Sequence, residues 1–321
     1  MGFDRRPLTP GDAGAWADLV NAIQDGYGID DFASEQDLKE EFGYPNQDFP
    51  QGSIAVYDGR TMVGFGLLAF RSVADPVHHV SYDGGVHPSY RRRGLGGELL
   101  DWAEKAAVPL HNRRFPGRPL SVSSWFLACD AAAVALHEQH GYQPVRYFHA
   151  MVRDLTAPVP EAAIPPGVAI TAYAPGMAEH ALLVRNEAFR DHWGSTETSA
   201  QSWAHFLEAS AFRPDLSFMA YQQTAPIGML SSREYEGYYK KTGRRDLHIA
   251  LVGTRAAGRN RGIASALLVT AMSAARASGY DRASLTVDAD SLTGAVRLYE
   301  RVGFAVDHTR AAYRKQLTVS S

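Results

Sequence analysis

Apolar residues recur along the chain with two spacings, one typical of helices and one typical of strands. A recurrence every three to four residues predicts helices, whereas alternation or a short apolar run beside a turn predicts strands. In the first half the expected elements are a helix opened by Thr9 and Pro10, a hairpin of 53–57 and 62–69, a strand at 77–86, a helix at 94–107, a strand at 120–127 and a helix at 131–139.

The second half contains a similar series of elements after two opening helices. The expected elements there are helices at 177–189 and 200–211, strands at 216–222, 227–232 and 246–254, a helix at 263–278, a strand at 283–288 and a helix at 293–302. Hairpins followed by alternating strands and helices indicate an α/β fold with a mixed sheet and helices on its faces.

Two motifs occur once in each half, in the same order. RRRGLGGELL at 91–100 corresponds to RNRGIASALL at 259–268, and LHEQHGY at 136–142 corresponds to LYERVGF at 298–304. The stretch between the halves contains four prolines within 157–167, which fit neither a helix nor a central strand. We therefore predict a duplicated domain, with an N-terminal domain at 1–156, a proline-rich linker at 157–167 and a C-terminal domain at 168–321.

The motif at 259–264 has the features of an anion-binding helix start. A strand is expected to end at Thr254 and a helix to begin near Gly262, so free backbone N–H groups and the positive end of the helix dipole would face the loop. Gly262 and the small Ala264 would let a pyrophosphate approach the backbone, and the two arginines would add charge-assisted donors. The loop at 91–96 has the same features. Taken alone, each motif fits a solvated basic loop with a helix cap equally well.

The anion-binding motif followed by the later helix motif, twice in one chain, resembles the GNAT superfamily of N-acetyltransferases. The matching positions are Arg259, Gly262 and Ala264 in one loop, Arg91, Gly94 and Gly96 in the other, and Leu298, Tyr299, Gly303 and Phe304 at the helix end. The resemblance covers both halves. It implies two tandem GNAT-like domains, each with a mixed, mostly antiparallel sheet, helices on both faces and a splayed central strand pair.

The resemblance also implies a site for acetyl-CoA. Within the family the loop binds the pyrophosphate of coenzyme A, and the preceding strand, here 251–254 or 84–86, diverges from its neighbour and pairs with the pantetheine arm. Ser291 stands where the family often has an asparagine. The cofactor-binding residues implied are Leu251, Val252, Thr254, Arg259, Asn260, Arg261, Gly262, Ile263, Ala264 and Ser291 in the second half, and Arg91, Arg92, Arg93, Gly94, Leu95 and Gly96 in the first.

Acyl transfer from a thioester to an amine needs a base for the amine and a proton donor for the leaving thiolate. In many family members a tyrosine at the helix end is that donor, which is Tyr299 here, whereas the first half has His137. We therefore expect a catalytic C-terminal domain and an N-terminal domain that has lost catalysis. His248 is the candidate base because imidazole titrates near neutral pH. The alternative is that His248 is an ordinary half-buried histidine of a strand, with no part in catalysis.

Acidic and aromatic residues after the first helix and after the hairpin of the second half suit a cationic, partly apolar amine. The candidate substrate-binding residues are Asp191, His192, Trp193, Glu197, Glu234 and Tyr235. The same residues also fit a helix cap and a solvated loop, and both interpretations stay open. The function expected is transfer of an acetyl group from acetyl-CoA to a primary amine of a small molecule. The alternatives are another acyl-CoA donor, an active N-terminal domain, or a non-catalytic coenzyme A-binding sensor or scaffold.

The composition limits the remaining possibilities. With 32 Lys and Arg against 35 Asp and Glu, the net charge of −3 disfavours a nucleic-acid-binding protein. The single cysteine, Cys129, excludes an internal disulfide framework and a cysteine-rich zinc site, and the twelve histidines do not cluster, so no metal is expected. We see no signal peptide and no uninterrupted apolar run of about 18 residues, so we expect a cytoplasmic protein that does not bind membranes.

Overall fold

The computed structural model describes residues 2–190, 192–291 and 294–318, and these divide into two compact units. Unit 1 comprises the chain up to Phe148 together with the segment from Thr309 onward, and unit 2 comprises His149–His308. The expected domains at 1–156 and 168–321 differ from this division, because the last strand of the chain belongs to the sheet of unit 1. The α/β class and the two mixed, mostly antiparallel sheets are as predicted.

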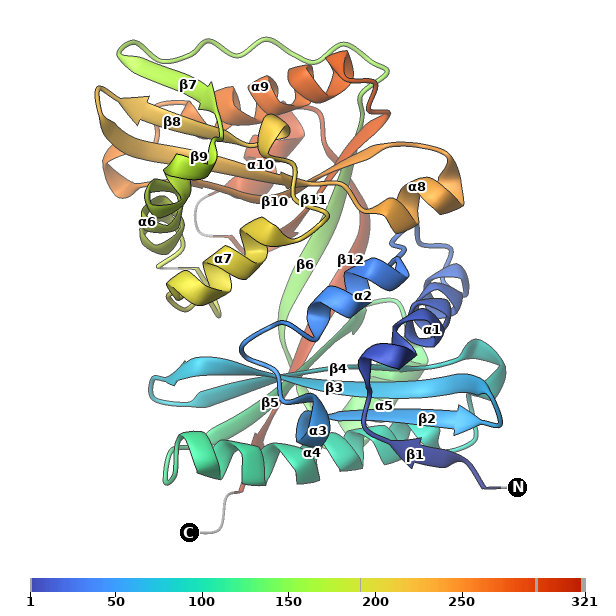
Figure 1. Ribbon diagram of the computed structural model, residues 1–321. Coiled ribbons are helices and arrows are strands. Elements are labelled where there is room, and N and C mark those ends of the chain that lie inside the picture. The colour runs from blue at the N-terminus through green and yellow to red at the C-terminus, as the bar shows by residue number, and fades with distance from the viewer. Residues whose placement is uncertain (1, 191, 292–293, 319–321) are drawn as a thin grey trace. The chain divides into compact units, whose positions relative to one another are not determined.

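The sheet of unit 1 has the strand order β1-β2-β3-β4-β5-β12 (Figure 1). Among the described strands of this unit, β4 and β5 are the one parallel pair. The strands are β1 (Asp4–Arg6), β2 (Ser53–Asp58), β3 (Thr61–Ala74), β4 (His78–Val86), β5 (Leu120–Leu127) and the part of β12 (Ala305–Leu317) from Thr309. The helices are α1 (Ala13–Asp25), α2 (Glu35–Glu41), α3 (Phe49–Gly52), α4 (Leu95–Arg114) and α5 (Ala131–Gln139).

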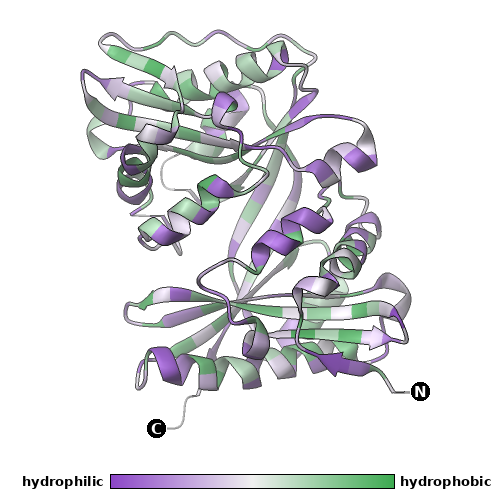
Figure 2. Cartoon of the chain, viewed as in Figure 1, coloured by the Kyte–Doolittle hydropathy of each residue, from purple (hydrophilic) through white to green (hydrophobic). Residues whose placement is uncertain are grey.

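Helices cover both faces of this sheet. The apolar residues of α4 pack into one core with Val80, Val122 and Tyr313, while Trp16 and Leu19 of α1 pack into a second core on the other face. The polar helix α2 buries none of its residues and is coloured largely hydrophilic in Figure 2. Unit 1 therefore has the layered architecture that the alternation of strands and helices predicts.

The sheet of unit 2 has the order β6-β11-β10-β9-β8-β7, and β10 pairs with β11 in parallel. The strands are the part of β6 (Gln143–Asp154) from His149, β7 (Val168–Ala172), β8 (Phe218–Gln222), β9 (Ala225–Arg233), β10 (Asp246–Thr254) and β11 (Arg282–Asp288). The helices are α6 (Ala178–Ala188), α7 (Ala200–Glu208), α8 (Glu236–Thr242), α9 (Ile263–Ala277) and α10 (Ala295–Arg301). Buried residues of α9 and α10 form one core, and residues of α6 and α7 form the core on the opposite face.

Most elements lie where the sequence predicts them. Strands 120–127 and 246–254 and helix 131–139 have the expected bounds. The helix expected at 94–107 continues to Arg114 through Pro109, and the segment after β9, expected as a loop, contains α8. Strands β1, β6, β7 and β12 and helices α2 and α3 were not predicted.

Gly303 fixes the end of α10 in a conformation that favours glycine. Its φ is +93°, and a Cβ there would lie 1.5 Å from Nη1 of Arg153. The buried guanidinium of Arg153 donates to the carbonyls of Val302 (2.5 Å) and Pro158 (2.7 Å), so it also fastens the start of the proline-rich segment. We expect Gly303→Ala to lower the free energy of unfolding by about 2–3 kcal/mol, because it adds the cost of a left-handed residue to the displacement of Arg153.

The control is Gly279→Ala, since Gly279 has a φ of +79° but, apart from its chain neighbours, no described residue lies within 4 Å of the added Cβ. This variant should lose only about 1 kcal/mol in a urea unfolding experiment. Equal losses in the two variants would mean that Arg153 moves aside without cost.

Candidate active site

The central parallel strands of each unit diverge towards their carboxyl ends. In unit 2, β10 and β11 pair from Asp246↔Arg282 to Ile249↔Leu285, and no further pair is recorded among the described residues although both strands continue. In unit 1, β4 and β5 pair only up to Tyr82↔Ser124. Each unit thus has the splayed strand pair that the sequence resemblance implies, with Leu251, Val252 and Thr254 on the diverging strand of unit 2.

A β-bulge distinguishes the splay of unit 2. Ile249 lies opposite Ser232 and Leu251 lies opposite Ser231, so Ala250 is an extra residue on β10. In unit 1 the pairing of β3 with β4 runs without a shift over the corresponding stretch, from Phe70↔Val80 to Gly64↔Val86. A bulge leaves backbone groups outside the ladder and can turn an N–H group toward a site, so unit 2 has a candidate backbone donor at its splay.

The loop before α9 forms an open concave arrangement of backbone N–H groups. Asn260 and Gly262 have φ values of +60° and +81°, and a Cβ on Gly262 would meet no described residue within 4 Å other than its chain neighbours. Among the described residues, no backbone carbonyl accepts from the N–H groups of 260–265, whereas the N–H of Ala266 bonds to the carbonyl of Gly262. Alternating backbone handedness followed by a free helix N-terminus makes an anion-binding site, which fits a pyrophosphate.

The loop before α4 in unit 1 repeats this backbone geometry. Arg92 and Gly94 have φ values of +64° and +83°, and the first helical bond returns from Glu98 to the carbonyl of Gly94. Leu95 is buried and Gly96 half-buried in the first turn of α4. Both loops therefore have a backbone suited to a phosphate.

The arginine side chains of the two loops have other contacts in the structure. Arg259 donates to the carbonyl of Ala188 (3.3 Å), and Arg261 donates to the side chain of Gln222 (2.9 Å). In unit 1, Arg91 lies over the ring of Tyr27 and Arg93 over that of Tyr90. The backbone, rather than the guanidinium groups, is thus already shaped for an anion.

Tyr299 on α10 is buried at 8% exposure, and its ring contacts that of Phe304. Burial raises the pKa of the Tyr299 phenol, so the phenol is protonated at neutral pH. Ser291, also expected near the cofactor, lies in the loop after β11 and donates its N–H to the carbonyl of Asp288.

His137 has a different chemical state from Tyr299. Its Nδ1 lies 2.7 Å from the carbonyl of Ala133, which only accepts, so Nδ1 carries the proton. Burial lowers the pKa of His137, and no described residue forms a hydrogen bond with its buried Nε2. Near neutral pH, the side chain therefore presents a lone pair where unit 2 has an O–H donor.

His248 and Tyr235 lie together, with ring centroids 5.6 Å apart. His248 is half-buried on β10, and its Nδ1 is 3.0 Å from the hydroxyl of Ser284 on β11. That hydroxyl also contacts Asp246. The sequence analysis missed Asp246 and Ser284, although alternation along a strand places Asp246 and His248 on the same face.

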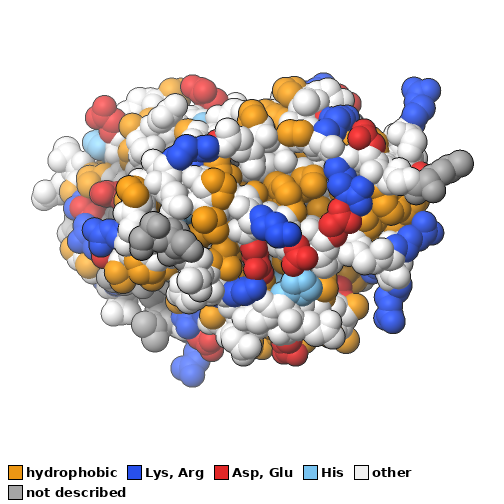
Figure 3. Space-filling model, turned by 90° about the horizontal axis from the view of Figure 1, so that it is seen from below, with side chains coloured by type: hydrophobic (Ala, Val, Ile, Leu, Met, Phe, Trp, Pro, Cys, Tyr) orange, Lys and Arg blue, Asp and Glu red, His pale blue; other side chains and the backbone are white. Residues whose placement is uncertain are grey.

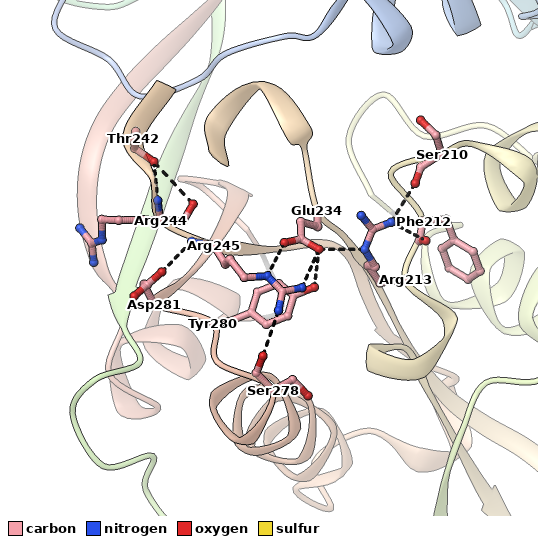
Figure 4. Close-up of polar contacts among 10 residues, drawn as sticks. All are labelled: Ser210, Phe212, Arg213, Glu234, Thr242, Arg244, Arg245, Ser278, Tyr280 and Asp281. Carbon is pink, nitrogen blue, oxygen red and sulfur yellow. Dashed lines mark hydrogen bonds and ion pairs between the residues drawn. The ribbon is translucent and has the colours of Figure 1, made fainter. Parts of the chain in front are cut away.

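The carboxylate of Glu234 is held by basic and phenolic groups of its own unit (Figure 4). It accepts from Arg213 (2.9 Å), from Arg245 (2.7 and 3.0 Å) and from the hydroxyl of Tyr280 (2.6 Å). Burial alone would raise the pKa of Glu234, but these donors lower it to about 2. Because its charge is already neutralised, we assign Glu234 to fastening the end of β9 rather than to an acceptor amine.

The other expected acceptor residues lie after α6. His192 and Trp193 are half-buried, the ring of His192 packs against Phe189, and Glu197 is exposed. Asp191 lies outside the described residues. These positions remain candidates for an acceptor site.

Charged side chains of both signs are mixed on the surface (Figure 3). On the face in Figure 3, basic and acidic side chains are interspersed and form no continuous basic stripe. No helix in the described ranges is both long and apolar enough to cross a membrane. Across the same residues, no group of three or more His, Cys, Asp or Glu side chains is placed to hold a metal ion.

Comparison with known proteins agrees with this geometry. The model of the acetyltransferase (GNAT) family matches residues 16–142 and 183–304, so it matches twice. A mycothiol acetyltransferase of Thermobispora bispora is 29% identical over 311 residues, covering 96% of this chain and 97% of the relative. One of Paenarthrobacter aurescens is 31% identical over 241 residues, covering 71% of this chain and 68% of the relative.

Solved structures share the tandem fold. A GCN5-related N-acetyltransferase from Sphaerobacter thermophilus is 28% identical with a TM-score of 0.77, covering 98% of this chain and 95% of that one. A tandem GNAT protein from the clavulanic acid biosynthesis pathway has a TM-score of 0.74 over the whole of both chains, and at 16% identity it shows the fold alone. Two family matches, a relative matched over 97% of its length and two splayed sheets lead to one conclusion: this chain belongs to the GNAT family and is an acyl-CoA-dependent acetyltransferase with a tandem layout.

Proposed function

We propose that unit 2 transfers an acetyl group from acetyl-CoA to a primary amine of a small molecule. The observation that carries this proposal is the combination, in unit 2, of a bulged splayed strand, a protonated buried phenol and a strand histidine. Unit 1 has the loop and the splay, but its described β4 has no bulge at the splay, and His137 stands where unit 2 has the phenol. We therefore assign unit 1 a structural or cofactor-holding role.

Different residues of unit 2 would bind different parts of the cofactor. The N–H groups of 260–265 would bind the pyrophosphate, and Leu251, Val252 and Thr254 would offer backbone groups of the diverging strand to the pantetheine arm. Within the described part of the chain, the buried hydroxyl of Thr254 has no hydrogen-bond partner. Bound acetyl-CoA supplies the activated acyl carbon.

Three groups of the chain would then serve acyl transfer. His248 takes a proton from the amine, which makes the nitrogen nucleophilic. A backbone N–H at the bulge, from Ala250 or Leu251, donates to the acyl oxygen as it gains negative charge. Tyr299 gives its proton to the departing sulfur, and the proton that the attacking nitrogen loses as the carbon–sulfur bond breaks returns to the phenolate.

The acceptor would enter beside His192, Trp193 and Tyr235. Aromatic side chains bind cationic and partly apolar groups, and Glu197 adds a negative charge. Because several relatives are named mycothiol acetyltransferase, the amine whose acetylation gives mycothiol is the first acceptor to test. Polyamines, amino sugars and peptides complete the panel.

The division of labour between the two loops can be tested with matched substitutions. Ala264 of α9 and Gly96 of α4 are both the second residue of their helix. A glutamate at this place is stabilised by the positive end of the helix dipole, but its charge repels a pyrophosphate. We expect Ala264→Glu to lower acetyl-CoA-dependent product formation by about 100-fold, since a charge-assisted site loses about 3 kcal/mol, and Gly96→Glu to leave it within about threefold.

Product and released coenzyme A should be separated and quantified by mass spectrometry, because a thiol-bearing acceptor interferes with thiol dyes. Loss of turnover in Gly96→Glu alone would assign catalysis to unit 1 and contradict the proposal. Calorimetry that shows acetyl-CoA binding without turnover of any amine would instead favour the sensor or scaffold.

A further inference from the structure

A row of polar side chains leads from His248 into the buried part of unit 2. The register of β10 and β11 places Asp246 opposite Arg282 and His248 opposite Ser284. Alternation puts all four side chains on one face of these strands. Asp246, at 8% exposure, accepts from Nε of Arg282 (2.8 Å) and from the hydroxyl of Ser284 (2.5 Å), and that hydroxyl lies 3.0 Å from Nδ1 of His248.

The direction of each hydrogen bond in this row follows from chemistry. Asp246 forms an ion pair with the guanidinium of Arg282, and a carboxylate only accepts hydrogen bonds. The one proton of the Ser284 hydroxyl therefore points to Asp246, which leaves the Ser284 oxygen as an acceptor toward His248. Nδ1 of His248 must then carry a proton, and in neutral imidazole the lone pair is on Nε2.

We propose that Asp246 and Ser284 are positioning residues that hold His248 in its Nδ1–H tautomer and support its positive charge during acyl transfer. This inference rests on the proposed function, in which His248 is the base. Neither residue touches the substrate in this scheme. Their effect reaches the amine only through the imidazole.

The proton balance of the step needs no transfer along the row. The ammonium form of the acceptor gives one proton to Nε2 of His248, and the N–H bond electrons stay on the amine nitrogen. The imidazolium keeps its Nδ1–H on Ser284, whose own proton stays on the Asp246 side. When His248 later releases the Nε2 proton to water, it returns to the tautomer that accepts the next one.

Other charged and aromatic groups near His248 also act on its imidazole. Arg233 of β9 lies opposite His248 in register, and its guanidinium is over the ring of Phe206 of α7. Tyr235 contacts the imidazole from the segment after β9. Arg233 and Arg282 disfavour an imidazolium by their charge. The dipole of the Ser284 hydroxyl, oriented by Asp246, is the contact that opposes this effect.

Unit 1 contains a histidine–serine pair that can be compared with His248 and Ser284. His79 of β4 lies opposite Ser121 of β5, with Nδ1 2.6 Å from the hydroxyl. Burial lowers the pKa of His79 to about 4, and Arg314 and Arg71 act in the same direction. A strand histidine on a serine therefore occurs in both units, but a carboxylate is bonded to the serine only in unit 2 among the described residues.

The first test reads the tautomer directly and does not depend on activity. Full-length protein labelled with ¹⁵N-histidine is compared as wild type, Ser284→Ala, Ser284→Thr and Ser121→Ala, with the His248 signals assigned from His248→Gln. We expect His248 to be in the Nδ1–H form in wild type and Ser284→Thr, and to move toward the Nε2–H form in Ser284→Ala. Ser121→Ala should leave the His248 signals unchanged.

The second test is the pH dependence of kcat/KM. Removing a group that stabilises the imidazolium lowers the pKa of the base, so the acidic limb in Ser284→Ala should move to lower pH by about half to one unit. At pH 7, kcat should fall by about tenfold because the lone pair is no longer fixed on Nε2. Ser284→Thr keeps the hydroxyl, so its acidic limb and its kcat at pH 7 should be close to those of the wild type. Asp246→Asn should shift the limb in the same direction, but because it also removes the carboxylate that accepts from Arg282, Ser284→Ala is the deciding variant.

The outcomes distinguish the positioning role of Ser284 from the role of His248 as the base. An unchanged tautomer in Ser284→Ala would overturn the positioning role. A changed tautomer with an unmoved acidic limb would overturn the use of His248 as the base, and with it the catalytic meaning of the row. A lower kcat with neither change would assign Ser284 a merely structural role, which also contradicts the proposal.

Discussion

Replacing Tyr299 with phenylalanine is expected to lower kcat by about 10²- to 10⁴-fold, the range for loss of a positioned general acid. The change removes one oxygen from a buried ring and keeps the packing against Phe304. Without the phenol, the departing thiolate must take its proton from water. The effect should fall on kcat more than on KM, because the O–H acts on the sulfur only as the carbon–sulfur bond breaks.

The control for this variant is Tyr280→Phe. Tyr280 is also buried, and its pKa is raised to about 12, by burial and by its bond to Glu234. It lies in the cluster of Figure 4 and has no place in the proposed chemistry. Tyr280→Phe should therefore cost stability but leave kcat within a few-fold. An unchanged rate in Tyr299→Phe would remove the phenol from the mechanism.

The pH dependence follows from the same burial. Since burial raises the pKa of Tyr299, the phenol keeps its proton at pH values where a free tyrosine would begin to ionise. The kcat of the wild type should therefore show no descending limb from Tyr299 between pH 7 and about 10.

Local sequence signals were sufficient to predict the backbone of the two loops. At 91–96 and 259–264, a glycine with positive φ and a helix start follow from a few neighbouring residues. Tyr299 is the proposed proton donor because a second motif follows each loop at nearly the same spacing. The duplication strengthened both predictions, since chance resemblance of two motifs in two halves is rare.

The side-chain partners of the site could not be predicted in this way. Asp246 and Ser284 are 38 positions apart, and only the register of two parallel strands brings them together. Glu234 was expected to face a substrate because it is a carboxylate beside aromatics. Its basic partners, 21 and 11 positions away, are found only in the folded chain.

The largest feature that the order of elements in the sequence does not predict is the position of the last strand, which pairs within the sheet of the other half. A duplicated sequence suggests that each half completes its own sheet. Instead, β12 pairs with β5 from Arg310↔Leu127 to Leu317↔Leu120, so the end of the chain completes the sheet of unit 1. Strand alternation predicts which face is buried but not which neighbour a strand will choose.

Deleting residues 309–321 should therefore destabilise unit 1 although the deletion lies at the far end of the sequence. Ala311, Ala312 and Tyr313 are buried, and Lys315 donates to both carboxylate oxygens of Glu104 (2.7 and 2.8 Å). Loss of the Tyr313 side chain alone would cost about 3 kcal/mol or more, by analogy with other buried aromatics, and the deletion also opens the edge of β5. A typical domain has only about 5–15 kcal/mol of stability in total.

Hydrogen exchange followed by mass spectrometry locates the effect. We expect amides in 120–127 and in α4 to exchange at least about 100-fold faster in the deletion variant, the factor that a loss of about 3 kcal/mol gives. Amides of β11 and α9 should keep their protection, because their contacts lie within His149–His308. Gln316→Ala, at an exposed position of the same strand, is the control and should change neither set. Protection retained in 120–127 after the deletion would show that unit 1 closes its sheet without β12, and the strand exchange would then add little to its stability.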